Sequence, residues 1–125
     1  MLKLASYAAG AWVGPGAGAR PIHSAVSGQV IAEAGDGALD FAGMVDYGKT
    51  VGGPALRAMG FRDRAKMLKA LALYLHARRD PLYELSYDTG ATLIDHKADV
   101  DGGIGTLFVF ASKGRREMPD SDIYV

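Results

Sequence analysis

The densest set of potential metal ligands lies in the segment LIDHKADVD, which contains three aspartates and a histidine. Carboxylate oxygens are the ligands that hard divalent cations prefer in proteins. Asp95 and Asp99 are four residues apart and would share one face of a helix, whereas His96 and Asp101 diverge from that face. Lys97 also sits among them. The pattern therefore favours a solvated helix face, and we expect no metal site.

The residue types and their spacing indicate no other catalytic site. The chain has no cysteine, which excludes disulfides, a thiol nucleophile and thiolate metal ligands within it. No serine–histidine–aspartate set or pair of buried carboxylates can be assembled. Residues 14–18 alternate glycines as a phosphate-binding loop does, but no strong strand leads into them and Pro15 lacks a backbone donor. We interpret this stretch as a linker.

The segment that follows, GGIGTLFVFASKGRRE, combines glycines, an apolar run and a basic end. Its key members are Gly102, Gly103, Gly105, Lys113, Arg115 and Arg116. By propensity alone, Thr106–Phe110 would form a buried strand, because β-branched and aromatic residues favour a pleated surface.

The length, composition and net charge of the chain limit the class of protein to which it can belong. Its 125 residues suffice for one domain, and 49% hydrophobic and 22% charged residues are typical of a soluble globular protein. A net charge of zero gives no electrostatic case for nucleic acid or an anionic membrane as partner. No apolar run reaches the roughly 20 residues of a membrane span. Tyr7, Gly10 and Trp12 interrupt the apolar stretch that a secretory signal needs, so we expect a cytoplasmic protein.

Residues 1–34 are expected to form β-hairpins. Leu4–Val13 contains two short aromatic-bearing pieces with a turn near Ala9-Gly10. Further on, two β-prone pieces, Ile22–Val26 and Gln29–Ala32, flank a turn at Ser27-Gly28.

Residues 36–116 are expected to be mainly helical. Asp36 is predicted to cap a helix over 37–50, with Leu39, Ala42, Val45 and Gly48 facing inward and Gly52-Gly53-Pro54 ending it. The clearest helix is Phe61–Arg78. Its apolar stripe is Phe61, Ala65, Leu68, Ala72 and Leu75, widened by Met67, Leu71 and Tyr74. Asp80-Pro81 is predicted to open another helix, with an acidic N-cap and a proline at the first helical position, and Gly90 to end it.

Four motifs occur in an order and spacing that resemble the start of an aldehyde dehydrogenase domain. They are Tyr7-x-x-Gly10-x-Trp12, Ser27-Gly28-Gln29-Val30-Ile31-Ala32, Arg64-Ala65-x-x-Leu68 and Asp88-Thr89-Gly90. Three further stretches, residues 51–59, 67–71 and 102–116, look like the aldehyde dehydrogenase half of the bifunctional enzymes of phenylacetate catabolism. Those enzymes hydrolyse the oxepin-CoA ring and oxidise the released CoA-linked semialdehyde with NADP.

The resemblance implies an α+β fragment of an α/β aldehyde dehydrogenase fold, with residues 1–125 as a single segment. In that family the nucleophilic cysteine, the general-base glutamate and the nucleotide-binding strands lie further along the chain. This chain is therefore expected to contain no catalytic or cofactor-binding residue and to be inactive alone. Its partners would be the remainder of the domain and, in the full enzyme, other copies in a homo-oligomer. The alternative is a stand-alone helical interaction module.

The resemblance also implies that residues 94–112 are helical, despite the cost of glycine in a helix interior, about 1 kcal/mol each relative to alanine. On this basis Asp99, Gly102, Gly103 and Gly105 are candidates to line a substrate tunnel, in which glycines leave room for a CoA-linked chain. The competing interpretation is that these glycines permit close helix packing. The basic residues would attract CoA phosphates if they face the same way.

Asp88 is a candidate for a monovalent cation site, by similarity to some relatives. The competing interpretation is an acid at a helix end, hydrogen-bonded to the following turn.

Overall fold

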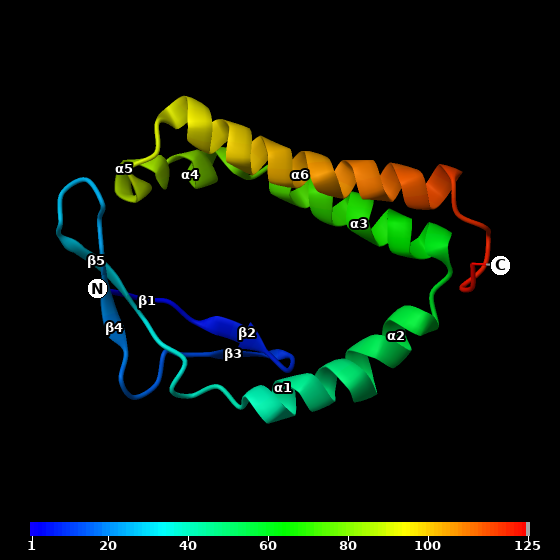
Figure 1. The fold of residues 1–125 in the computed structure, drawn as a ribbon, viewed down its shortest axis with the longest axis horizontal. Coiled ribbons are helices and arrows are strands. Elements are labelled where there is room, and N and C mark those ends of the chain that lie inside the picture. The colour runs from blue at the N-terminus through cyan, green and yellow to red at the C-terminus, as the bar shows by residue number, and fades with distance from the viewer. Residues whose placement is uncertain (125) are drawn as a thin grey trace. The chain divides into compact units, whose positions relative to one another are not determined.

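The computed structural model describes residues 1–124, which form two compact units. Unit 1 comprises Met1–Gly53 together with Asp88–Gly90, and unit 2 comprises Pro54–Tyr87 together with residues 91–124. All strands of the described residues belong to unit 1, and the two longest helices belong to unit 2 (Figure 1). The chain thus has mixed α and β content with only short strands. None of the described helices is both long enough and apolar enough to cross a bilayer.

The first predicted hairpin is confirmed. Strands β2 (Ser6–Ala8) and β3 (Ala11–Val13) pair antiparallel, with Tyr7 opposite Trp12. Their two-residue loop is Ala9-Gly10, and both residues have positive φ, 48° and 85°. This conformation suits the right-handed twist of a tight hairpin, and glycine adopts it without strain.

The second predicted hairpin is confirmed with shifted bounds. Strand β4 (Arg20–His23) pairs antiparallel with β5 (Val30–Ala34). The β4 strand ends early because the buried Ser24 side chain accepts hydrogen bonds from the backbone N–H groups of Val26 and Ser27, each at 3.3 Å. These groups therefore belong to the turn. Strand β1 (Leu2–Lys3), too short to leave a sequence pattern, adds to β5 in parallel and gives the order β1-β5-β4.

The predicted start of the first helix was wrong. Helix α1 spans Phe41–Tyr47, and its N-cap is Asp40, whose carboxylate accepts the backbone N–H of Gly43 at 2.9 Å. Residues 36–39 instead form a turn, in which the N–H of Leu39 donates to the carbonyl of Asp36 at 2.9 Å. The predicted inward stripe was also wrong, since α1 contains no buried residue and Val45 is 58% exposed.

The predicted stop at Gly52-Gly53-Pro54 was wrong as well. After α1 the backbone continues as a π-helical turn, η1 (Gly48–Gly52), and then as α2 (Gly53–Arg57). The N–H of Gly53 donates to the carbonyl of Gly48, five residues back. Pro54 has no N–H for an ordinary helical bond, and its ring would clash with the preceding turn. In the wider π-helical turn neither the missing N–H nor the proline ring ends the helix.

Unit 2 is built on two helices that pack along each other, α3 (Phe61–His76) and α6 (Leu93–Arg116) (Figure 1). Ala65 and Ala72 of the predicted α3 stripe are buried, while Met67, Leu71 and Tyr74 are exposed and do not widen it. The helical prediction for residues 94–112 is confirmed. Packing against α3 therefore overrides the strand propensity of Thr106–Phe110.

Shorter helices connect α3 to α6. Helix α4 (Arg79–Tyr83) starts one residue before Asp80, so the predicted N-cap and first-position proline were wrong. The predicted single helix is interrupted by a turn at residues 84–85, and its second part, α5 (Ser86–Thr89), ends before Gly90, the predicted stop, where φ is 77°.

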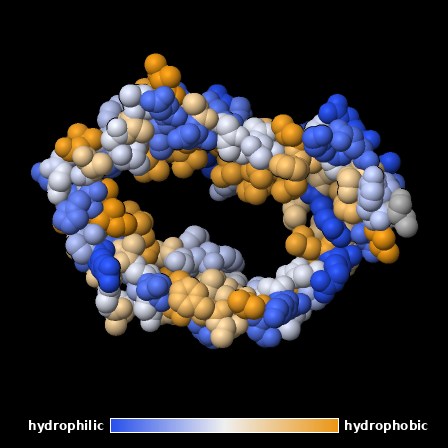
Figure 2. All heavy atoms as spheres, in the orientation of Figure 1, coloured by the Kyte–Doolittle hydropathy of each residue, from blue (hydrophilic) through white to orange (hydrophobic). Residues whose placement is uncertain are grey.

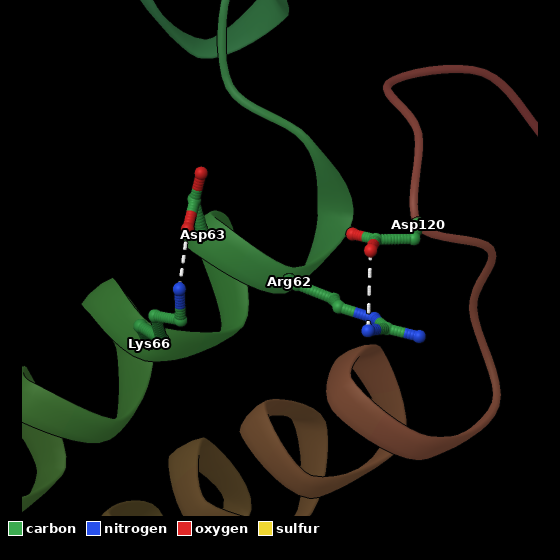
Figure 3. Close-up of polar contacts among 4 residues, drawn as sticks. All are labelled: Arg62, Asp63, Lys66 and Asp120. Carbon is green, nitrogen blue, oxygen red and sulfur yellow. Dashed lines mark hydrogen bonds and ion pairs between the residues drawn. The ribbon is translucent and has the colours of Figure 1, made fainter.

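The residues that follow α6 fold back onto the start of α3. Arg62 pairs with Asp120 at 3.2 Å (Figure 3). The N–H of Phe61 donates to the carbonyl of Ser121. These contacts anchor the last described residues to unit 2.

One glycine of α6 allows the close approach of α3. A Cβ placed on Gly114 would lie 3.1 Å from the Cβ of Ala65, which is tighter than ordinary packing. We expect Gly114→Val to destabilise the protein by about 1–3 kcal/mol through overpacking. The matched control is Gly102→Ala on the same helix, where an added Cβ meets nothing within 4 Å. The control should be neutral or stabilising by up to about 1 kcal/mol.

The measurement is the thermal unfolding midpoint of the protein that contains this chain, for both variants side by side. A midpoint that falls equally for the two substitutions would contradict the role given to Gly114.

Candidate functional site

The glycines predicted to line a tunnel lie on α6 away from its contact with α3. Apart from its own helix turn, a Cβ on Gly102, Gly103 or Gly105 would meet no atom of unit 2 within 4 Å. Ile104, between them, is buried. The helix stays intact here, and Thr106 donates its hydroxyl to the carbonyl of Gly102 at 2.9 Å. At these positions α6 therefore presents its backbone without side chains at the helix surface.

Not all of the predicted site residues share one face. Asp99 is exposed and lies three residues before Gly102 and four before Gly103, so the three are neighbours on the helix surface. Gly105 is two residues after Gly103, a rotation of about 200°. Asp99, Gly102 and Gly103 are therefore neighbours, whereas Gly105 is a neighbour of Gly102, three residues before it, and faces away from Gly103.

The close-packing interpretation fits a different glycine. Within unit 2 the tight helix contact is made by Gly114, and no described residue packs closely on Gly102, Gly103 or Gly105. Within unit 2 the space beside these three glycines is open.

The acidic segment at the start of α6 does not gather its side chains. Thr92 donates its hydroxyl to the Asp95 carboxylate at 2.7 Å and accepts the Asp95 N–H, which caps the helix. His96 contacts the carbonyl of Leu82 at 2.9 Å through Nε2, and Asp101 accepts from Tyr83. In the described part of the chain no three histidine, aspartate or glutamate side chains are grouped as a metal site requires.

Sequence reasoning missed the contact between Tyr83 and Asp101. The Tyr83 hydroxyl donates to the Asp101 carboxylate at 2.6 Å, and this hydrogen bond, with a smaller contribution from burial, raises the pKa of Tyr83. Lys97 lies over the Tyr83 ring, 5.2 Å from its centre. The contact joins α4 to α6. The two residues are 18 positions apart, and no local pattern in the sequence signals such a pair.

Asp88 is half-buried at the end of α5, in unit 1. Its backbone carbonyl accepts the N–H of Ala25 at 2.8 Å, which ties the turn between β4 and β5 to this helix end. Asp88 is therefore placed at a structured turn.

Two of the basic residues at the end of α6, Lys113 and Arg115, do not face the same way. Lys113 forms an ion pair with Glu117 at 3.3 Å and lines an apolar groove with Phe61 and Phe110. Arg115 lines a separate groove with residues of α3. The basic residues were expected to attract CoA phosphates together only if they faced the same way. Lys113, Arg115 and Arg116 therefore do not act as one phosphate-attracting cluster.

Both units expose large apolar side chains. Among the described residues no large side chain is fully buried, and Trp12 of β3 and Phe110 of α6 are 73% and 60% exposed. Figure 2 shows hydrophobic residues, in orange, at the surface of the molecule. Exposed apolar surface on this scale commonly marks a face that another protein segment covers.

No protein-family model matches the chain. The chain is 35% identical over 116 residues to 3,4-dehydroadipyl-CoA semialdehyde dehydrogenase of Aromatoleum evansii. The aligned region covers 91% of this chain and 22% of that enzyme, so the chain spans about a fifth of the curated relative it matches. The resemblance predicted from the sequence motifs is thus confirmed: the chain matches a segment of a larger enzyme.

Proposed function

We propose that this chain is the N-terminal segment of an aldehyde dehydrogenase domain whose full-length protein oxidises a CoA-linked semialdehyde with NADP. The observation that carries the proposal is the 35% identity, which extends over 91% of the chain, to a CoA-linked semialdehyde dehydrogenase. The substrate is proposed to be the semialdehyde of phenylacetate catabolism, and the protein to be cytoplasmic.

The proposed fold is the first part of an α/β aldehyde dehydrogenase, with short strands and helices that flank the nucleotide-binding region. The exposed apolar side chains of both units support this proposal, because the remainder of the domain would cover them. The full-length protein would assemble as a homo-oligomer. NADP would bind to residues outside this chain.

Within that domain, α6 would line the substrate tunnel at Asp99, Gly102, Gly103 and Gly105. The open space beside the three glycines supports this role, since a tethered chain needs room to pass. Because Gly105 is a neighbour of Gly102 only, we expect Gly102 and Gly103, which both lie beside Asp99, to contribute most.

The test is a steady-state assay of the purified full-length protein that contains this chain. We expect NADP reduction with a CoA-linked semialdehyde, at a higher kcat/KM than with a short free aldehyde. A folded protein that oxidises neither compound with NADP or NAD would refute the proposed activity.

The Asp88 carboxylate is proposed as a ligand for a monovalent cation in the full-length protein. Replacing sodium by potassium or by a bulky organic cation should then change the thermal unfolding midpoint. The control is Asp88→Asn, in which this dependence should be lost. A midpoint that is the same in all three salts would favour a helix-end acid that only stabilises its turn.

A second candidate is a stand-alone helical interaction module, which the exposed apolar faces of α3 and α6 also favour. A module would bind its partner through these faces and would need no further catalytic segment. The two candidates differ in the size of the native protein.

A further inference from the structure

A groove of about 300 Å³ opens along the contact between α3 and α6 in unit 2. Its polar residues come in pairs at helical spacing, two from each helix. The lining residues are Ala65, Lys66, Lys69, Phe108, Ala111, Ser112 and Arg115. The groove thus has an apolar floor and four polar side chains along its edges.

The electrostatics of the groove favour an anion. Three of its lining residues are cationic and none is acidic. Lys66 is compensated by Asp63, whose carboxylate lies 2.8 Å from the amine and raises the pKa of Lys66 (Figure 3). Lys69 and Arg115 form no ion pair with any described residue. These two charges are therefore available to a ligand.

The donor chemistry fits a phosphate ester. The planar guanidinium of Arg115 can donate two parallel hydrogen bonds to a phosphate, and Lys69 adds a mobile point charge. The Ser112 hydroxyl supplies a further donor beside Arg115. The buried Ala65 and Ala111 reduce the water around a bound anion, which strengthens such contacts.

We propose that this groove binds a phosphate group of coenzyme A, through Lys69 and Arg115. The choice of coenzyme A as the source of the phosphate rests on the proposed function, whereas the affinity for phosphate rests on the groove itself. The groove would hold the nucleotide end of a CoA thioester on the full-length protein.

The test compares two double variants of the full-length protein, with coenzyme A as the calorimetric probe. Lys69→Gln with Arg115→Gln removes two charges from the groove. The matched control, Lys113→Gln with Arg116→Gln, removes two charges from the same end of α6 outside the groove. We expect the groove variant to weaken coenzyme A binding about tenfold or more and the control to change it less than twofold.

Two further arms identify the source of the phosphate. Inorganic phosphate should compete with coenzyme A for the unmodified protein and not for the groove variant. NADP affinity should be the same in all three proteins. Equal weakening by the two double variants, or a loss confined to NADP, would overturn the proposal.

A third arm separates this proposal from the proposed function. Oxidation of a short free aldehyde reports on the dehydrogenase alone and should persist in the groove variant. If the groove variant still oxidises the short aldehyde and binds coenzyme A as tightly as the unmodified protein, the groove proposal is refuted. The proposed dehydrogenase function is then unaffected. Tenfold weaker coenzyme A binding in a protein that oxidises no aldehyde supports the groove and refutes the dehydrogenase.

Discussion

The 125-residue chain alone should reduce no detectable NADP with any aldehyde, and it should bind NADP weakly or not at all. An aldehyde dehydrogenase of this kind needs a thiolate that attacks the aldehyde and releases a hydride to the cofactor. The chain has no cysteine, so this step has no nucleophile within it. The expected effect is a complete loss relative to the full-length protein, measured as NADPH formation.

The control is the full-length protein at the same molar concentration, with the mass of both preparations verified. Sustained NADPH production by the purified 125-residue chain would show that the chemistry does not depend on a downstream cysteine.

Gly103→Leu in the full-length protein should lower kcat/KM for the CoA-linked semialdehyde by about tenfold or more while sparing a short free aldehyde. The added side chain would occupy the open surface beside Asp99 and Gly102, where a tethered substrate is proposed to pass. A misplacement of substrate by about 1 Å can itself cost on the order of 100-fold in rate. Steady-state kinetics with the two substrates measures the difference.

Gly103→Ala is the matched control for this substitution. It adds a single methyl group where nothing lies within 4 Å and should favour the helix by about 1 kcal/mol. Its kinetics should resemble those of the unmodified protein. Equal losses for both substrates in Gly103→Leu, or a large fall in its unfolding midpoint, would instead favour close packing of this glycine against another segment.

Local sequence signals predicted the elements whose conformation is determined locally. Ala9-Gly10 supplies the positive φ values of a two-residue loop, and the first hairpin forms there. The buried face of α3 was also predicted from the sequence, since Ala65 and Ala72 recur at helical spacing and are buried. The resemblance supplied the helical assignment of residues 94–112, which propensity alone would have missed.

Errors arose where contacts between distant residues decide the outcome. Asp36 was predicted as the N-cap, but Asp40 is the residue whose side chain accepts the backbone N–H of Gly43. Pro54 was expected to end a helix, but the π-helical turn before it avoids the clash.

In the candidate sites, too, contacts between distant residues could not be predicted from the sequence. The sequence identified Gly102 and Gly103 as unusual, but only the structure shows that the space beside them is open. Lys69 and Arg115 are 46 residues apart and come together through the packing of α3 on α6. Sequence reasoning grouped Arg115 with Lys113, its near neighbour on the chain, although the two line different grooves.

The most direct measurement is the intact mass of the native protein that carries this sequence, isolated with an antibody against residues 61–116. A segment of a dehydrogenase domain predicts a mass several times the 13.2 kDa of this chain, with a cysteine-containing peptide downstream of Val125. A native protein of 13.2 kDa that is monomeric and unfolds cooperatively would contradict that origin and support the stand-alone module.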